Sequence, residues 1–507
     1  MFSSVFSATV SGVDGFRVIV ETDVSGGLPG LEIVGMPAAS VREAKHRVRS
    51  AIRNSGFEVP SRRITVNLAP AGLHKDGTQL DLAIAVSLLV ASRQLPEANA
   101  IHKYGFLGEL ALDGSVRPVP GVLAMVLALY ESGHEGAVIP ADNQAEVAFL
   151  TGFDIRVASN LAQVARFVGQ EAWLPSAEAP ASKVKAATSG QGAFEQIRGQ
   201  RAAKRALEIA AAGEHNILLA GPPGAGKSML AKALPEIMPD LTPEEAVTVT
   251  KIHSVAGLLP KGSGLLKRRP FRAPHHTVTP AAMVGGGAIP KPGEITLAHR
   301  GVLFLDELPE FSAQVINVLR QPIEDGVINI ARSGGTYRFP CRILLAAAMN
   351  LCQCGYWRSD WQHCQCTPYQ RRQYVSKVNG PLLDRIDLFM PVQRVDIEDL
   401  ARAGCEEAAD SVKERVEEAR KLQEKRLEEF GLATNSEMGP RELSTLLSIS
   451  ASGRRLLLDA YSRMKLSARA YYRVMRVAAS IADLDQSSRI EEEHVAEALS
   501  YRQRILE

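Results

Sequence analysis

The sequence predicts an α/β fold in three regions: an α+β domain, a second α/β domain and a helical C-terminal region. In the first region, short β-rich runs alternate with helical stretches over residues 1–168. In the second, an apolar run at Ile217–Ala220 leads directly into a glycine-rich loop and then a helical stretch. Beyond Ile397 the pattern is helical almost throughout. A chain of 507 residues exceeds one ordinary hydrophobic core, so several domains are expected.

Composition places the chain among ordinary globular proteins. Hydrophobic residues make up 46% and charged residues 22% of it, and the net charge is +2. No apolar run approaches the roughly 20 residues that span a bilayer. The first residues, Met1–Phe6, contain neither a basic segment nor a long apolar segment, which argues against a secretory signal. We therefore expect no membrane partner and a cytoplasmic location.

The same patterns predict where each region ends. Residues 1–168 form the α+β domain. Residues 169–193 are small, polar and proline-bearing, which is typical of a linker. Residues 194–395 form the second α/β domain, and residues 396–507 form the helical domain.

A phosphate-binding loop follows the apolar run at Ile217–Ala220. It consists of Gly221, Pro222, Pro223, Gly224, Ala225, Gly226, Lys227 and Ser228, and it matches the pattern G-x-x-x-x-G-K-S between a strand and a helix. The glycines let backbone N–H groups converge on an anion at the positive end of the helix. Lys227 is expected to reach the β- and γ-phosphates of ATP, and the Ser228 hydroxyl to bind Mg²⁺.

Two adjacent carboxylates end a second apolar run. Gly301–Leu305 reads as a buried strand, and Asp306 and Glu307 follow it directly. After a phosphate-binding loop in the same domain, Asp306 is expected to hold Mg²⁺ and Glu307 to polarise the attacking water. Neighbouring side chains point in different directions along a strand, which suits two separate tasks.

Four further stretches carry a resemblance to a known family. They are Ile197–Gln200, Arg272–Thr277, Met349–Gly355 and Gly380–Leu388. Together with the phosphate-binding loop, they resemble the AAA+ ATPases, and specifically the magnesium-chelatase-like group that includes the ComM/YifB family. The resemblance covers nearly the whole chain, and it implies a P-loop ATPase core with a C-terminal helical lid.

The resemblance also implies roles for individual residues. Asn350 looks like the sensor-1 residue that helps to position water, and Arg385 resembles the arginine finger offered to a neighbouring subunit's ATP. Arg469 resembles the sensor-2 residue of the lid, with Arg473 as the alternative. A finger that acts on a neighbour requires self-association, and the family implies a homohexamer.

A segment without acidic residues lies between the two nucleotide motifs. Residues 246–293 contain no Asp or Glu but carry seven cations, of which Lys267, Arg268, Arg269 and Arg272 are the candidate DNA contacts. A stretch of one sign is typical of a surface that meets a polyanion. The alternative is a solvated basic loop that docks on an acidic neighbour. In related helicases, an insertion at this place points into the central pore.

Four cysteines gather in a short loop, residues 351–368. Cys352, Cys354, Cys364 and Cys366 form two C-x-C pairs, and four thiolates can surround Zn²⁺ tetrahedrally. The C-x-C spacing is tighter than the common C-x-x-C, so a reduced, metal-free cluster stays open as the alternative. Four protein ligands leave no open position, which favours structural over catalytic zinc.

The N-terminal region resembles the Lon-protease fold through Gly72–Asp81 and Gly105–Pro118. Where the protease pattern has its serine and lysine, this chain has Gln79 and Leu123. Without nucleophile and base there is no acyl transfer, so we expect a non-proteolytic domain. Basic residues recur at helical spacing over Ser40–Asn54, which indicates either DNA contact or a solvated helix face.

Two functions are consistent with these features. The first is a hexameric ATP-dependent DNA translocase or helicase that promotes branch migration in homologous recombination and natural transformation, which is what the family resemblance implies. Its partner would be single-stranded, double-stranded or branched DNA. The second is a chelatase-like or chaperone-type remodeller that acts on a protein partner.

Overall fold

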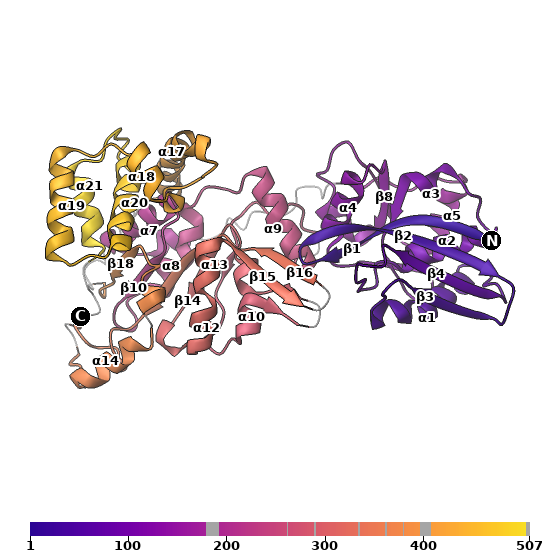
Figure 1. Cartoon of the computed structure of the whole chain (residues 1–507), viewed down its shortest axis with the longest axis horizontal. Coiled ribbons are helices and arrows are strands. Elements are labelled where there is room, and N and C mark those ends of the chain that lie inside the picture. Colours follow the sequence, from indigo (N-terminus) through magenta and orange to yellow (C-terminus); the bar gives the residue numbers. More distant parts are fainter. Residues whose placement is uncertain are drawn as a thin grey trace.

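The structure is a computed structural model in which three parts follow one another along the longest axis (Figure 1). The part near the N-terminus lies at one end, the helical part lies at the other, and a second α/β part lies between them. The described residues are 1–178, 192–260, 262–287, 290–332, 335–359, 362–378, 380–395 and 407–502. No helix in these ranges is long and apolar enough to cross a membrane.

The N-terminal part is built on a mixed seven-stranded sheet of order β3-β4-β2-β1-β5-β8-β9. Strand β4 and the first half of β1 alternate buried and partly exposed side chains, as expected for a sheet whose two faces differ in burial. The strands are β1 (Phe2–Ser11), β2 (Asp14–Ser25), β3 (Gly30–Val34), β4 (Arg63–Ala69), β5 (Tyr104–Phe106), β8 (Gly136–Pro140) and β9 (Asp154–Ala158). The helices are α1 (Ala39–Asn54), α2 (Asp81–Ala91), α3 (Asn99–Lys103), α4 (Val122–Glu131) and α5 (Leu161–Val168).

The predicted linker, residues 169–193, is only partly linker. Residues 174–177 pack back on the N-terminal part: Leu174 is buried, and the Val157 N–H donates to the Pro175 carbonyl at 2.9 Å. Ala177 closes the same contact by donating to the Ile155 carbonyl at 2.9 Å. Residues 179–191 lie outside the described residues. The first part of the predicted linker therefore extends the N-terminal fold, because its apolar side chain and backbone groups find partners there.

The middle part contains a five-stranded sheet of order β11-β14-β17-β10-β18, in which every neighbouring pair is parallel. Its three central strands are buried throughout, as expected for a parallel sheet covered on both faces. The strands are β11 (Phe271–Arg272), β14 (Val302–Leu305), β17 (Leu344–Met349), β10 (Ile217–Ala220) and β18 (Leu388–Pro391). Helices α7 (Arg201–Gly213) and α8 (Lys227–Ile237) flank β10 in the chain. The parallel sheet confirms the predicted α/β class.

The helical part packs on the middle part through a continuous hydrophobic core. That core joins apolar side chains of α7, α8 and the parallel sheet to those of the C-terminal helices. The interface is also polar, since the Arg420 guanidinium donates to the Ala211 carbonyl at 2.9 Å. The C-terminal helices are α17 (Ala409–Leu427), α18 (Pro440–Leu446), α19 (Ala451–Arg463), α20 (Ala468–Leu484) and α21 (Glu492–Ser500).

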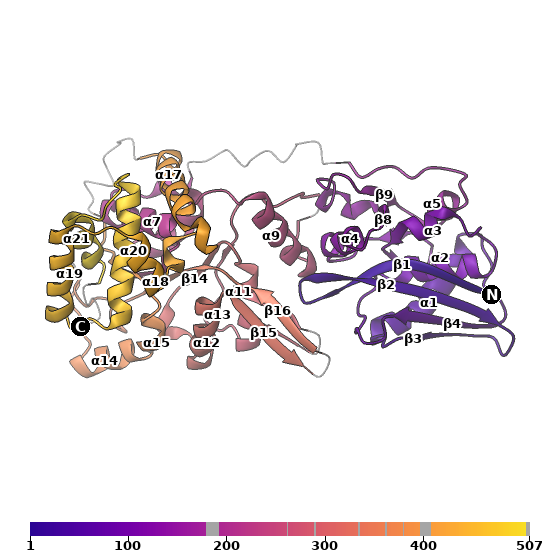
Figure 2. The same cartoon turned by 45° about the horizontal axis from the view of Figure 1, so that its top comes forward.

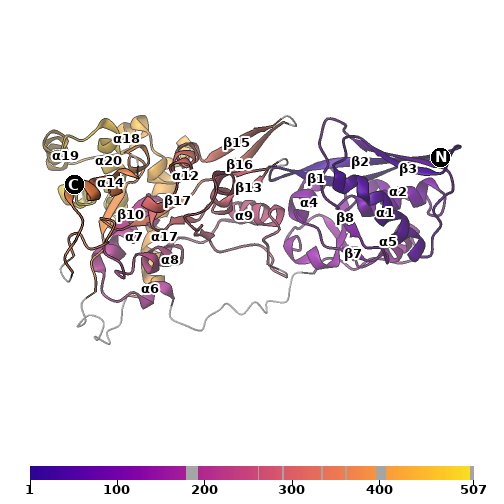
Figure 3. The same cartoon turned by 90° about the horizontal axis from the view of Figure 1, so that it is seen from below.

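One helix of the middle part, α9 (Pro243–Val255), contacts α4 of the N-terminal part (Figures 2 and 3). The Gly121 N–H donates to the Ser254 carbonyl at 3.0 Å, and the buried Ser254 hydroxyl donates to Glu146 at 2.5 Å. At the other end of this contact, Lys251 pairs with Asp14 at 2.7 Å. The start of the acid-free segment is therefore a joint between two parts of the chain.

Candidate active site

The phosphate-binding loop connects β10 to α8. Gly224 and Gly226 have φ angles of +76° and +87°, which side chains rarely adopt, and they turn the loop toward the start of the helix. A Cβ atom at Gly221 would lie 2.0 Å from the Val392 carbonyl oxygen, so only glycine fits there. The strand–loop–helix setting that the motif requires is therefore present.

Lys227 lies at the centre of this loop. Its ammonium donates to the carbonyls of Gly221 and Pro222, both at 2.8 Å, and to the Asn350 Oδ1 at 3.0 Å. Burial lowers the pKa of Lys227, because it disfavours the charged form, and the nearby carboxylates of Asp306 and Glu307 oppose that shift. The expected phosphate-binding lysine and the expected sensor-1 residue are thus in direct contact.

The two carboxylates follow β14, two strands away from β10 in the same parallel sheet. The Ser228 hydroxyl donates to Asp306 Oδ2 at 2.7 Å. Hydroxyl and carboxylate oxygens are ligands that Mg²⁺ prefers, so this pair fits the magnesium that the resemblance implies. Glu307 adopts a left-handed φ of +51° and its side chain is 60% exposed, which leaves it accessible to substrate and water.

His276 is a neighbour of Glu307 that sequence reasoning missed. Its Nδ1 lies 3.7 Å from Glu307 Oε2, and its ring contacts that of His275 in a tilted arrangement with centroids 4.1 Å apart. The only sequence signal was its position in the Arg272–Thr277 stretch, which carried the family resemblance without a role for the histidines.

Arg385 lies at the opposite end of β10 from the phosphate-binding loop. The Asn216 side chain, just before β10, donates to the Arg385 carbonyl at 2.9 Å, and Arg385 pairs with Glu324 at 2.6 Å. The four-residue strand that separates Asn216 from the loop spans about 13 Å. Arg385 therefore faces away from the phosphate site of its own chain.

Both sensor-2 candidates, Arg469 and Arg473, lie close to Arg385. Arg385, Arg469 and Arg473 line one cavity of about 530 Å³ between the middle part and the C-terminal helices. Arg469 is exposed, whereas Arg473 pairs with the buried Asp387 at 3.5 Å. The structure thus gathers the three arginines, and it separates them from Lys227 and Asp306.

Similarity to known proteins extends over nearly the whole chain. Residues 193–400 match the family described as magnesium chelatase, subunit ChlI; residues 20–143 and 406–502 match two further ChlI families, the second being the ChlI C-terminal family. YifB of Escherichia coli K12 is 41% identical over 99% of this chain and 97% of its own. Competence protein ComM of Haemophilus influenzae is 40% identical over 98% of this chain and 97% of its own. The chain belongs to the ComM/YifB family.

Membership in this magnesium-chelatase-like AAA+ family confirms the resemblance on which the residue roles were based. The family also accounts for the parallel sheet and for the helices that follow it. An AAA+ protein uses ATP with Mg²⁺. The hydrogen bond between Ser228 and Asp306, and the position of Lys227 in the phosphate-binding loop, suit that use.

The chain carries a partial similarity to Lon proteases. Lon protease 2 of Bacillus subtilis is 27% identical over 124 residues, or 23% of this chain. Gln79 is buried, and its amide donates to Thr9 Oγ1 at 2.9 Å, while Leu123 is fully buried. Both side chains pack inside the domain, so these two positions hold neither a nucleophile nor a base.

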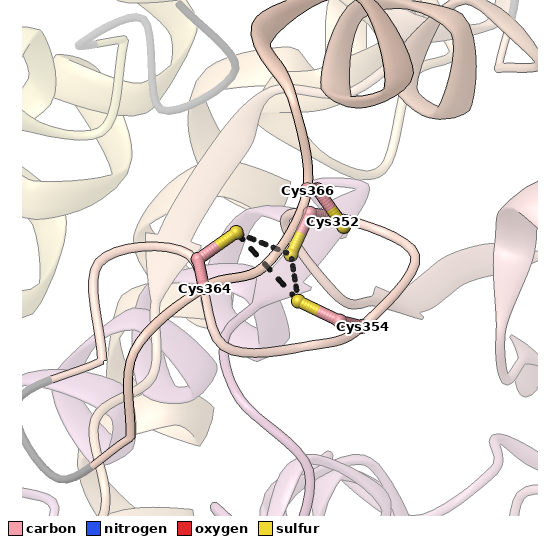
Figure 4. Close-up of side chains that lie close together, drawn as sticks. All are labelled: Cys352, Cys354, Cys364 and Cys366. Carbon is pink, nitrogen blue, oxygen red and sulfur yellow. Dashed lines mark hydrogen bonds between the residues drawn. The ribbon is translucent and has the colours of Figure 1, made fainter.

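The four cysteines come together after β17 (Figure 4). The sulfurs of Cys352, Cys354 and Cys364 are 3.3, 3.6 and 3.7 Å apart, and all four sulfurs, including that of Cys366, lie within 4.8 Å of one another. Sulfurs around a tetrahedral zinc, with Zn–S near 2.3 Å, are about 3.8 Å apart. The Trp357 N–H donates to Cys352 Sγ at 3.3 Å, a contact that also suits a metal-bound thiolate. The cluster therefore fits zinc.

The acid-free segment does not present its four candidate cations as one surface. Arg269 is only 6% exposed; it pairs with Glu245 at 3.3 Å and donates to the carbonyls of Pro239 and Arg300. Arg272 pairs with Glu294 at 2.7 Å. This placement corrects the expectation for Arg269 and Arg272, because acids just outside the segment hold both guanidinium groups.

Lys267 and Arg268 remain exposed, as does Lys291 at the far end of the segment. Within the described residues, none of these three forms an ion pair with a carboxylate. Lys261, another cation of the segment, lies outside the described residues. The exposed cations are thus fewer than the sequence predicts.

A β-hairpin that sequence reasoning missed adds two exposed arginines. Strands β15 (Val327–Arg332) and β16 (Gly335–Pro340) form an antiparallel pair that extends from the middle part, and Arg332 and Arg338 are exposed on it (Figure 1). Arg332 donates to the Gly287 carbonyl at 3.3 Å, which joins this hairpin to the end of the acid-free segment. The Gly334-Gly335 pair between two strand-like runs was the available signal.

Proposed function

We propose that this chain is an ATP-dependent DNA translocase that works as a homohexamer and promotes branch migration in homologous recombination and natural transformation. The observation that carries the proposal is the division of the nucleotide site. Lys227, Ser228 and Asp306 meet at one end of the parallel sheet, whereas Arg385 lies at the other. A ring unites these halves, because each subunit's Arg385 then faces the next subunit's ATP.

The residues of one chain have distinct tasks in the proposed hydrolysis. Loop N–H groups and Lys227 bind the phosphates, and Ser228 with Asp306 holds Mg²⁺, which neutralises phosphate charge when bound. Glu307 accepts a hydrogen bond from the attacking water and orients it, and Asn350 positions that water from the neighbouring strand. Arg385 from the next subunit stabilises charge that develops in the transition state. Positioning and charge stabilisation supply most of the catalysis.

Exposed cations of the short β12 (Gly285–Gly286)–β13 hairpin and of the adjacent β15–β16 hairpin support the proposed DNA contact. Lys291 lies on β13 (Lys291–Pro292), while Arg332 and Arg338 lie on the β15–β16 hairpin that contacts the same region. Lys267 and Arg268 add exposed charge elsewhere on the acid-free segment. Contacts of this kind bind phosphates without reading sequence, as a translocase requires. The name of the competence protein relative fits a role in DNA uptake.

We also propose that Cys352, Cys354, Cys364 and Cys366 bind one structural zinc ion. The sulfur spacing supports it, and four thiolates complete a tetrahedron without an open position. Measuring the metal content of the purified protein tests this. One zinc per chain is expected, and protein that is active but free of zinc would contradict it.

ATP hydrolysis measured against three DNA forms tests the main proposal. Single-stranded, double-stranded and branched DNA should each be compared with no DNA at low salt, where phosphate contacts are strongest. We expect stimulation by DNA and unwinding of forked or three-stranded substrates. Glu307→Gln is the control, since it should bind ATP yet hydrolyse it about 100-fold more slowly or worse. Equal rates with and without DNA would overturn the proposal.

The alternative is a remodeller of a protein partner, and one observation favours it. Of the acid-free segment's cations, Lys251, Arg269 and Arg272 pair with carboxylates of this chain instead of facing solvent. Under this alternative, replacing Lys267 and Arg268 with alanine leaves DNA binding unchanged. Under the translocase proposal the same double variant binds DNA more weakly.

A further inference from the structure

The cysteine loop is next to the nucleotide site in the chain and in space. It begins immediately after β17, and Asn350 and Leu351 are the only residues between that strand and Cys352. Asn350 accepts a hydrogen bond from Lys227 at 3.0 Å. The loop's first cysteine is therefore only two residues away from a side chain that contacts the phosphate-binding lysine.

A second contact joins the loop to the phosphate-binding loop itself. Gly355 has a φ angle of +87°, and a Cβ atom there would lie 2.6 Å from Pro223 Cγ and 2.7 Å from Pro223 Cδ. The same atom would lie 3.9 Å from Asn350 Cγ. Gly355 therefore packs its backbone against Pro223, and no side chain fits between the two loops.

The cysteine loop has little regular structure of its own to hold this contact. Its described residues up to the start of α14 (Pro368–Ser376) form turns and irregular backbone, closed by local bonds such as Gly355 N–H to the Cys352 carbonyl at 3.0 Å. Cys352 is buried, whereas the other three cysteines are partly exposed. A metal ion that ties four such positions together would be the main constraint on the loop's shape.

We propose that the four cysteines, when they bind zinc, and the adjacent Gly355 form a positioning element of the ATP site, which holds Pro223 and Asn350 in their phosphate-binding arrangement. The inference rests on the proposed ATP site and the proposed zinc. It adds that metal occupancy sets nucleotide affinity: loss of zinc releases Gly355 from Pro223, and the loop N–H groups no longer converge on the phosphates.

Three variants of the full-length protein test the zinc site and the contact between Gly355 and Pro223 separately. Cys354→Ser combined with Cys364→Ser removes two metal ligands. Gly355→Ala keeps all four thiols but places a methyl group against Pro223. Gly431→Ala is the matched control, because Gly431 also has a positive φ, +64°, yet a Cβ atom there meets nothing within 4 Å. Zinc content and the dissociation constant for a fluorescent ATP analogue with Mg²⁺ are measured for each, and circular dichroism verifies folding.

We expect Gly355→Ala to keep one zinc per chain and to bind the analogue roughly tenfold more weakly or worse, because overpacking displaces Pro223. The double cysteine variant should lose both zinc and affinity, and Gly431→Ala should match the wild type. For wild-type protein, removal of zinc by a chelator should weaken binding, and added zinc should restore it. If a variant fails to fold, the measurement on zinc-depleted wild-type protein still tests whether zinc sets the affinity for nucleotide.

Each possible failure points to a different premise. Wild-type protein without zinc overturns the metal site. Wild-type protein that holds zinc but does not bind the analogue overturns the proposed ATP site. Zinc-bound Gly355→Ala and zinc-depleted wild-type protein that both bind the analogue normally overturn the positioning role alone.

Discussion

At the scale of single residues, the role of a charged side chain in this protein depends on whether the fold buries it. Arg269, expected from its basic surroundings to contact DNA, instead ends among buried groups. It lies near Glu214. Burial alone would raise the pKa of Glu214, but the positive charges of Arg420, Arg269 and Arg300 lower this pKa to about 2. The guanidinium of Arg269 therefore neutralises an interior charge, and its neighbour Arg268 faces solvent.

Arg269→Ala should lower the free energy of unfolding by about 1–3 kcal/mol, because it removes one of the charges that offset Glu214 and Glu245 and leaves two backbone carbonyls without their donor. Arg268→Ala is the matched control and should change stability by less than about 0.5 kcal/mol. Chemical denaturation of both variants measures the difference. Two variants of equal stability would show that Arg269 does not hold the interior together.

His215 should make stability fall in mild acid. Burial lowers its pKa from 6.5 to about 4, since the imidazole is enclosed and contacts the Ser480 hydroxyl at 2.8 Å. Above pH 6.5 the His215 imidazole is neutral in both the folded and the unfolded chain. As the pH falls from 6.5 to 4, His215 becomes protonated in the unfolded chain but stays neutral in the folded chain. The free energy of unfolding therefore decreases by up to about 3 kcal/mol.

Chemical denaturation at several pH values measures this slope. His215→Gln should reduce it without removing it, because burial also lowers the pKa of His299, to about 3. His46→Gln, which changes an exposed histidine, should leave it unaltered. A slope that is the same in wild type and His215→Gln would rule out the buried imidazole as its source.

At the scale of whole elements, the β15–β16 hairpin is the strongest candidate to touch DNA. Replacing Arg332 and Arg338 with alanine should weaken DNA binding and reduce the salt dependence of affinity by about one for each lost phosphate contact. The exposed pair Arg454 and Arg455 on α19 provides the control, and its replacement should change neither quantity. DNA titrations at several salt concentrations measure both, and an unchanged slope for the hairpin variant would remove the hairpin from the contact surface.

Sequence reasoning succeeded where an element is defined by a short run of residues. The conformation of the loop from Gly221 to Ser228 can be predicted from the local sequence, because its glycines, its lysine and the flanking strand and helix are consecutive in the chain. It failed where partners are distant in the chain. Arg269 is buried and pairs with Glu245, 24 residues away, and the β15–β16 hairpin depends on strand pairing that alternation alone indicates weakly. Charge can be read from a sequence, but exposure depends on the fold.

At the scale of the whole molecule, Arg385 and the phosphate-binding loop lie too far apart to complete one site in one chain. Arg385→Ala and Lys227→Ala should each abolish hydrolysis. A mixture should regain part of it, because some interfaces then combine an intact loop from one variant with an intact arginine from the other. Phosphate release from mixed and unmixed samples measures this. A mixture as inactive as its components would mean that Arg385 serves its own chain or none.

The core shared by the parallel sheet and the C-terminal helices has a mechanical consequence. A single apolar interior runs through both, and Arg420 and Gln423 of α17 donate to the carbonyls at the end of α7. Bending between them would expose that interior to water, so the two parts are expected to turn together as one stiff body. If ATP drives movement in a ring of such bodies, the hinges lie between chains, and the stroke is a rotation of each subunit against its neighbours.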